Sequence, residues 1–131
     1  MHTNLAATLT SWRRHLHANP GLTLHEGETA AFVVARLKEM GLTDIVENVG
    51  GHGVVATIRR GGGNRSVGLR GDMDALPIQE QNEDLPWKST NPGVMHACGH
   101  DGHTTALLGA AKMLLDDPNW TGTVRLGVVG S

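Results

Sequence analysis

Residues 67–129 carry a strand pattern, a helix pattern and a second strand pattern in succession. Residues 67–70 form a short, mainly apolar run, and residues 123–129 alternate between apolar and small or polar side chains, as strands do. Between them the apolar side chains repeat at helical spacing: Leu107, Leu108, Ala111, Leu114 and Leu115. Two strands joined by a helix usually pair in parallel, with the helix packed across the sheet. The chain is therefore expected to contain a βαβ unit and to belong to the α/β class.

Two helices are predicted before this unit. The apolar residues of the first share one face: Leu5, Leu9, Trp12 and Leu16. Asn19-Pro20-Gly21 ends this helix. Thr23 and Glu26 fit a capping box at the start of a second helix, which stops at Gly41. We interpret the polar residues of this region as helix surface and caps: His15, His17, His25 and Glu26.

A change of period at Asp44 indicates strands. Residues 45–49 and 54–58 are β-branched runs separated by Gly50-Gly51-His52-Gly53, which predicts a hairpin. Residues 54–58, 67–69 and 124–128 are expected to share one mixed sheet in a three-layer αβα fold. The proline-rich connection between residues 77 and 94 is expected to be an ordered surface loop.

The segment from Met95 to His103 concentrates metal-binding side chains. It holds the only cysteine, three of the eight histidines and one aspartate. Cys98 and His100 combine a soft sulfur with an imidazole, a pair that suits a transition metal better than calcium or magnesium. The alternative is a polar loop with a free thiol.

The predicted topology brings acidic residues toward this pair. Asp72 and Asp74 lie just beyond the carboxyl end of the strand at residues 67–70, where ligands bind in open α/β sheets. Asp101 is placed to cap the helix that follows the cluster, and the amino end of that helix is expected at the same sheet edge. Turn and capping chemistry is the alternative role for Asp72 and Asp74. Their convergence with Cys98 and His100 favours a functional site.

Composition excludes several classes of function. A net charge of −2 and an aromatic content of 3% leave neither a basic groove nor stacking platforms, so no nucleic-acid partner is expected. The most apolar segment, residues 106–115, is short and interrupted by Lys112, and the first residues carry no export signal, so no membrane insertion is expected. A single cysteine forms no intrachain disulfide, and a thiol ligand favours the reducing cytoplasm.

The chain resembles the metal-dependent amidohydrolase family of hippurate hydrolases, N-acyl-amino-acid amidohydrolases and plant auxin-conjugate hydrolases. The matching motifs are Arg14-His15-Leu16-His17-x-x-Pro20, residues 70–77 (Arg-Gly-Asp-Met-Asp-Ala-Leu-Pro), residues 95–103, residues 108–112 and residues 122–126. The resemblance implies a zinc-peptidase-like catalytic domain in which Cys98 and His100 bind two divalent ions, commonly manganese, zinc, nickel or cobalt. It also implies that Asp74 is the catalytic carboxylate that orients the site. Supporting positions around the ligands are implied for the remaining residues: Asp72, His96, Asp101 and His103.

The sequence departs from the family pattern after residue 126. The family continues into Gln-Pro-Ala-Glu-Glu, whose glutamates act as general base and metal ligand, whereas this sequence reads Gly127-Val128-Val129-Gly130-Ser131. Residues 1–131 are accordingly expected to be the N-terminal portion of one catalytic domain, without its lid or dimerisation domain and C-terminal portion. Unpaired apolar faces are expected to promote association of copies.

Three functions remain open. The first is hydrolysis of small N-acyl amino acids such as hippurate by metal-activated water. The others are metal binding without catalysis and a structural role that needs a partner. We expect no turnover from residues 1–131 alone.

Overall fold

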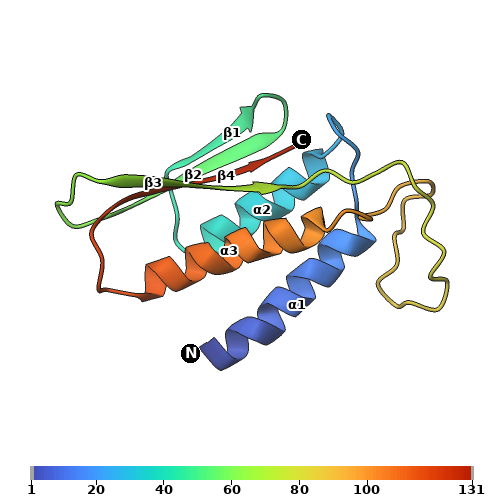
Figure 1. Cartoon of the computed structure of the whole chain (residues 1–131), viewed down its shortest axis with the longest axis horizontal. Coiled ribbons are helices and arrows are strands. Elements are labelled where there is room, and N and C mark those ends of the chain that lie inside the picture. The colour runs from blue at the N-terminus through green and yellow to red at the C-terminus, as the bar shows by residue number, and fades with distance from the viewer. Residues whose placement is uncertain (1, 131) are drawn as a thin grey trace.

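The computed structural model describes residues 2–130, with side chains from residue 4 onward (Figure 1). Three helices and four strands follow one another along the chain. They are α1 (His2–Ala18), α2 (Gly27–Glu39), β1 (Ile45–Val49), β2 (Gly53–Arg60), β3 (Ser66–Asp72), α3 (His100–Asp116) and β4 (Gly122–Val129). The predicted helices, the hairpin and the strand–helix–strand unit are all present.

The four strands form one mixed sheet in the order β1-β2-β4-β3. β2 pairs antiparallel with both β1 and β4, while β3 and β4 pair in parallel. Val67 of β3 lies opposite Val124 of β4, and the register holds to Asp72 opposite Val129. α3 is the crossover between these parallel strands, so the predicted βαβ unit and the single mixed sheet are confirmed.

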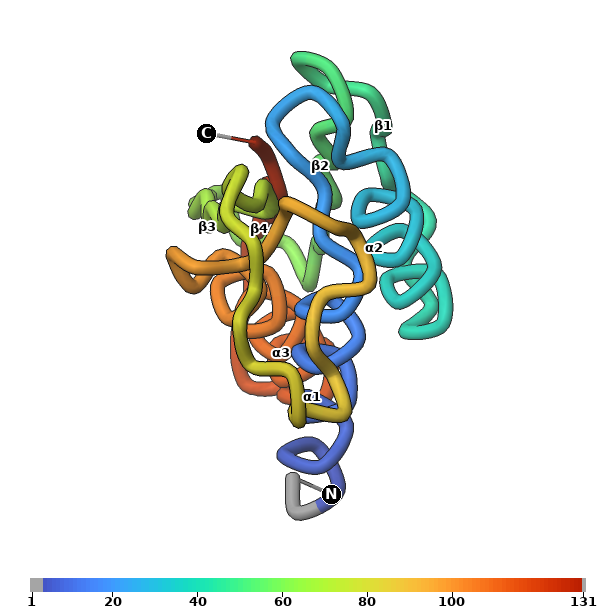
Figure 2. Tube along the Cα trace, turned by 90° about the vertical axis from the view of Figure 1, so that its right-hand side faces the viewer, coloured from blue at the N-terminus to red at the C-terminus, as the bar shows by residue number. Residues whose placement is uncertain are grey.

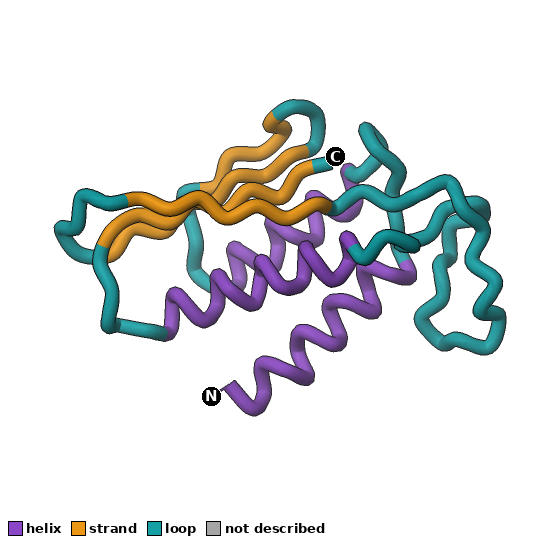
Figure 3. Tube along the Cα trace, in the orientation of Figure 1, coloured by secondary structure: helices purple, strands orange, loops and turns teal. Residues whose placement is uncertain are grey.

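All three helices lie on the same side of the sheet (Figures 1 and 3). α2 contacts β2, α3 contacts β3 and β4, and α1 packs against α3. The side chains of β4 reflect this arrangement, because Val124, Leu126 and Val128 are buried while Arg125 is exposed. The α/β class is confirmed, and the described residues place helices on one face of the sheet.

The core lies between these helices and the sheet. Val33 of α2, Leu108 of α3 and Ala56 of β2 are at most 1% exposed. Each large aliphatic side chain that is buried stabilises the fold by about 1.5–3 kcal/mol. The packing of α2 and α3 on the sheet therefore dominates the stability of the fold.

A long loop, residues 73–99, joins β3 to α3 and covers one end of the molecule (Figure 2). It contains no helix or extended strand pairing, as predicted, apart from isolated bridges that include Leu76 opposite Met95. Thr90 fastens the loop to the end of α1 through a bond from its backbone N–H to the carbonyl oxygen of Ala18, 2.8 Å long. The loop is therefore ordered by contacts with α1.

Two predicted helix caps are wrong. α2 begins after Glu26 without a side-chain cap, and the Thr23 hydroxyl donates instead to Asp74 Oδ2 at 2.8 Å. α3 begins at His100, and its N-cap residue is Gly99, which has no side chain, instead of Asp101. Asp101 lies inside its first turn. These polar side chains form tertiary contacts, which satisfy them better than a local cap.

Candidate metal centre

The site lies where the carboxyl end of β3 meets the amino end of α3. Glycine at position 71 allows this close approach, since a Cβ there would lie 3.1 Å from the carbonyl oxygen of His103. Thr104 of α3 donates its hydroxyl to the carbonyl oxygen of Asp72 at 2.8 Å. The first turn of α3 is thus fixed directly against the end of the strand, as the topology predicted.

Asp74 holds the ring of His100. Nδ1 of His100 lies 2.9 Å from the carbonyl oxygen of Asp74 and 3.1 Å from its Oδ1. Asp74 is 6% exposed and its other oxygen accepts the Thr23 hydroxyl, so its orientation is fixed as well. Because acceptors surround Nδ1, the proton of a neutral ring belongs there and Nε2 is left with a lone pair. A histidine oriented by a carboxylate in this way is typical of metal ligands.

Three donor groups converge beside this ring. One atom each from Asp72, His100 and His103 lies within 4.8 Å of the others. The two imidazoles stack with ring centroids 5.3 Å apart. Asp72 and His100 are partly buried, His103 is exposed, and Arg70 forms a 2.8 Å ion pair with Asp72. Two imidazoles and one carboxylate fit a divalent transition metal, so the residues present are chemically suited to hold one.

The donor group of Asp72, His100 and His103 shares only His100 with the predicted pair of Cys98 and His100. Cys98 is exposed, and within the part of the chain that the structure describes, the donor group of three contains His100 but not Cys98. Asp72 and His103, which the sequence suggested as supports, stand among the donors. The role of Cys98 as a ligand stays a prediction.

His96 is buried between the donors and α1. It is 5% exposed, and neither ring nitrogen has a hydrogen-bond partner in the structure. Burial lowers the pKa of His96 to about 4; nearby Asp101 opposes this change, and His17 and His100 add to it. The ring is therefore neutral near pH 7. Its predicted place beside the ligands, as a supporting residue, stays a prediction.

The burial of His17 and the contacts of Glu80 differ from the prediction. His17 was predicted on the helix surface, but it is 4% exposed and bonds to Asp101 and Glu80. The prediction was wrong because an apolar stripe shows only which face is hydrophobic, and not which polar side chain has a buried partner. Glu80 lies in a loop without periodicity, so no local pattern marks it. The motif around His17 was the available signal for that residue.

Residues 68–131 match Peptidase family M20/M25/M40. The chain is 48% identical over 114 residues to a hippurate hydrolase of Campylobacter jejuni, covering 87% of this chain and 29% of that protein. It is 50% identical over 103 residues to an N-acyl-L-amino acid amidohydrolase of Geobacillus stearothermophilus, covering 79% of this chain and 27% of that protein.

Residues 68–131 belong to the M20/M25/M40 peptidase family. The fold agrees, because a solved M20 peptidase of Bacillus subtilis, described as dinuclear and metal-binding, superposes with a TM-score of 0.90 at 36% identity. That superposition covers 98% of this chain and 36% of the other. The chain thus spans less than a third of the curated relatives named above. Among the described residues no helix is long and apolar enough to cross a membrane.

Proposed function

We propose that this chain supplies metal-holding residues of a metal-dependent amidohydrolase that cleaves the amide bond of N-acyl amino acids. The observation that carries the proposal is the convergence of Asp72, His100 and His103 at the end of β3. The names of the two relatives support hippurate-like, small-molecule substrates. The dinuclear description of the solved relative supports two ions in a complete site.

Each residue of the site has a distinct task in this proposal. His100 would bind a divalent ion through Nε2 while Asp74 keeps its Nδ1 proton in place. Asp72 and His103 would add a carboxylate and a second imidazole, and Cys98 remains a predicted thiolate ligand. Asp74 serves as an orienting carboxylate. Manganese, zinc, nickel and cobalt all accept such donors, and a bound divalent ion polarises an amide carbonyl and acidifies water. A thiolate ligand suits the reducing cytoplasm.

Cobalt binding tests this proposal directly. Co²⁺ titrated into the purified chain should produce visible d–d absorption, and His100→Ala should lower the affinity at least tenfold or so. His25→Ala is the matched control, because His25 is an exposed histidine outside the donor group. Equal loss in both variants would show unspecific histidine binding. In Cys98→Ala, disappearance of thiolate-to-cobalt charge-transfer absorption would establish Cys98 as a ligand.

Metal binding without catalysis is the second candidate. It is favoured because, among the described residues, the donor group of Asp72, His100 and His103 contains no glutamate that could act as a general base. Loss of a general base typically lowers the rate by about 10²- to 10⁴-fold. Hippurate hydrolysis should then not exceed the metal-only control when Mn²⁺ or Co²⁺ is supplied to the 131-residue chain. Turnover that disappears in Asp74→Ala would contradict this and place a base within these residues.

A further inference from the structure

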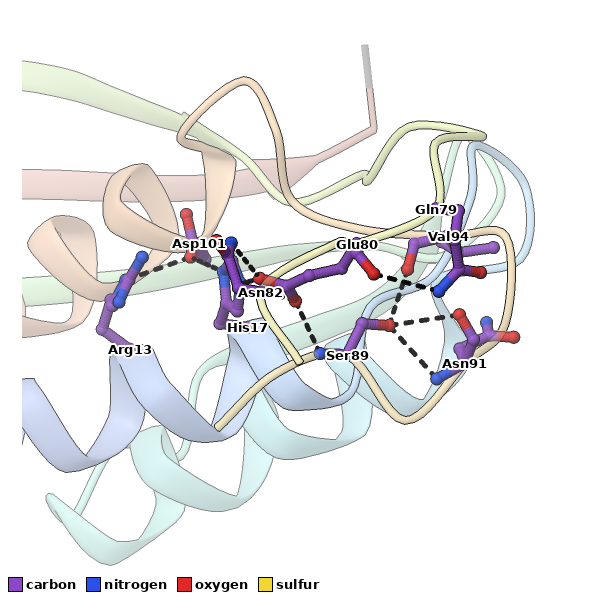
Figure 4. Close-up of polar contacts among 9 residues, drawn as sticks. All are labelled: Arg13, His17, Gln79, Glu80, Asn82, Ser89, Asn91, Val94 and Asp101. Carbon is purple, nitrogen blue, oxygen red and sulfur yellow. Dashed lines mark hydrogen bonds and ion pairs between the residues drawn. The ribbon is translucent and has the colours of Figure 1, made fainter. Parts of the chain in front are cut away.

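A network of buried charged and polar side chains connects α1, the 73–99 loop and α3. His17 of α1 bonds through Nδ1 to Asp101 Oδ2 at 2.9 Å and through Nε2 to Glu80 Oε2 at 3.0 Å (Figure 4). Arg13, one turn earlier on α1, places Nε 3.1 Å from the same Asp101 oxygen. His17 is therefore the central link between the loop and the start of α3.

The carboxylates of this network accept further hydrogen bonds. Glu80 also accepts a bond from Asn82 Nδ2 at 2.9 Å and one from the backbone N–H of Ser89 at 2.7 Å. Asp101 accepts the backbone N–H of Gly102 at 2.9 Å. Both ring nitrogens of His17 face carboxylate oxygens, so the ring is held between two acidic side chains.

Such a network favours fixed geometry over stability. The side chains of His17, Glu80 and Asp101 are 6%, 1% and 3% exposed. Removing charged groups from water is costly, and buried ion pairs often stabilise a fold no better than apolar residues do. Their bonds are directional, however, and a fully bonded set allows few arrangements of the three segments.

Asp101 transmits this geometry to the metal donors. It follows His100 directly and lies two residues before His103. Gly99, the residue before α3, has no side chain that could cap the helix. In place of a cap, the bonds from His17 and Arg13 to Asp101 hold this turn toward α1, while Thr104 holds it to Asp72.

We propose that His17 is a positioning residue that holds Asp101, and thereby places His100 and His103 opposite Asp72, with Glu80 fixing the ring of His17. The proposal rests on the metal site proposed above. It assigns a function to the loop as well, because Glu80 couples the loop to the donors.

Cobalt spectra of matched variants test the positioning role. His17→Gln keeps the approximate length of the side chain and one donor nitrogen, which cannot reach both carboxylates. His15→Gln is the control at an exposed position two residues away on α1. We expect His17→Gln to weaken Co²⁺ binding by about ten- to a hundredfold and to shift the d–d bands, as loss of an outer partner does. His15→Gln should leave both unchanged. If His17 had a purely structural role, His17→Gln would lower the unfolding free energy and leave the cobalt spectrum of the folded protein unaltered.

Two further variants keep the test decisive if His17→Gln fails to fold. Arg13→Gln alters a side chain that is 41% exposed, and Glu80→Gln leaves His17 and Asp101 in place. Each should weaken Co²⁺ binding by a smaller factor, about two- to tenfold, with circular dichroism unchanged. If every folded variant kept the Co²⁺ affinity and the Co²⁺ spectrum of the parent, the positioning role would be overturned, but the proposed metal site would not. A parent chain without Co²⁺ binding would overturn the metal site and this inference with it.

Discussion

Acidification should weaken the fold between about pH 4.5 and pH 2 because Glu80 must take up a proton in that range. Burial raises the pKa of this carboxyl, but the hydrogen bonds from Asn82, His17 and Ser89 outweigh burial and lower it from 4.5 to about 2. The unfolded state therefore binds its proton first as the pH falls. Stability from Glu80 is complete above pH 4.5 and decreases toward pH 2.

The lowering of the Glu80 pKa from 4.5 to about 2 corresponds to at most about 3.5 kcal/mol. At pH 3 the Glu80 carboxyl is mostly protonated in the unfolded state and still mostly ionised in the folded state, so about 2 kcal/mol of this should be lost between pH 7 and pH 3. Urea unfolding followed by tryptophan fluorescence at pH 7, 4.5 and 3 measures this quantity. The parent should lose more stability on acidification than Glu80→Gln, whose side chain does not titrate.

Glu83→Gln is the matched control, because Glu83 is exposed in the same loop. It should follow the parent at every pH. The carboxylates outside the Glu80 network are the same in the parent and in Glu80→Gln, so the difference between these two proteins reports the loss of the Glu80 carboxylate. Parallel pH profiles for parent and Glu80→Gln would refute the reasoning.

Three other outcomes are expected. Leu108→Ala should lower the unfolding free energy by about 3–5 kcal/mol in urea titrations, since Leu108 is 1% exposed in the core and leaves a cavity. Gly122→Ala should lower the unfolding free energy by about 2 kcal/mol or more, because Gly122 has a φ of +124° and a Cβ there would lie 2.7 Å from the Arg65 carbonyl oxygen. Gly62→Ala is the control: a Cβ at Gly62 meets no atom within 4 Å, so the unfolding free energy should change by less than about 0.5 kcal/mol. Exposed Cys98 should react with a thiol reagent in the native protein, and saturating Co²⁺ should slow that reaction if Cys98 is a ligand.

Periodic patterns predicted most of the fold, because burial on one face leaves a regular signal in the sequence. The stripe from Leu5 to Leu16 gave α1, and the repeat from Leu107 to Leu115 gave α3. The caps were missed because a polar residue such as Thr23 has the same local signature whether it caps a helix or bonds a distant carboxylate.

The candidate site was partly predictable. Asp74 and His100 follow from topology, since the end of β3 and the start of α3 must meet in a βαβ unit. Topology does not determine which donors approach within a few ångströms, so the grouping of Asp72 and His103 with His100 needed the structure. The bond from His17 to Glu80 joins residues 63 positions apart with no periodic signal in the loop.

The strand order also determines when this fold can form. β4 is the last of the four strands in sequence, yet it lies between β2 and β3. Until β4 is available, β3 has no neighbour in the sheet and β2 pairs only with β1. Ser66 must find Thr123 across 57 positions, so closure of the sheet is an entropically costly, non-local event. During synthesis on the ribosome, α1 and the hairpin should emerge before β4. Until β4 inserts between β2 and β3, the unpaired edges of these two strands can promote aggregation.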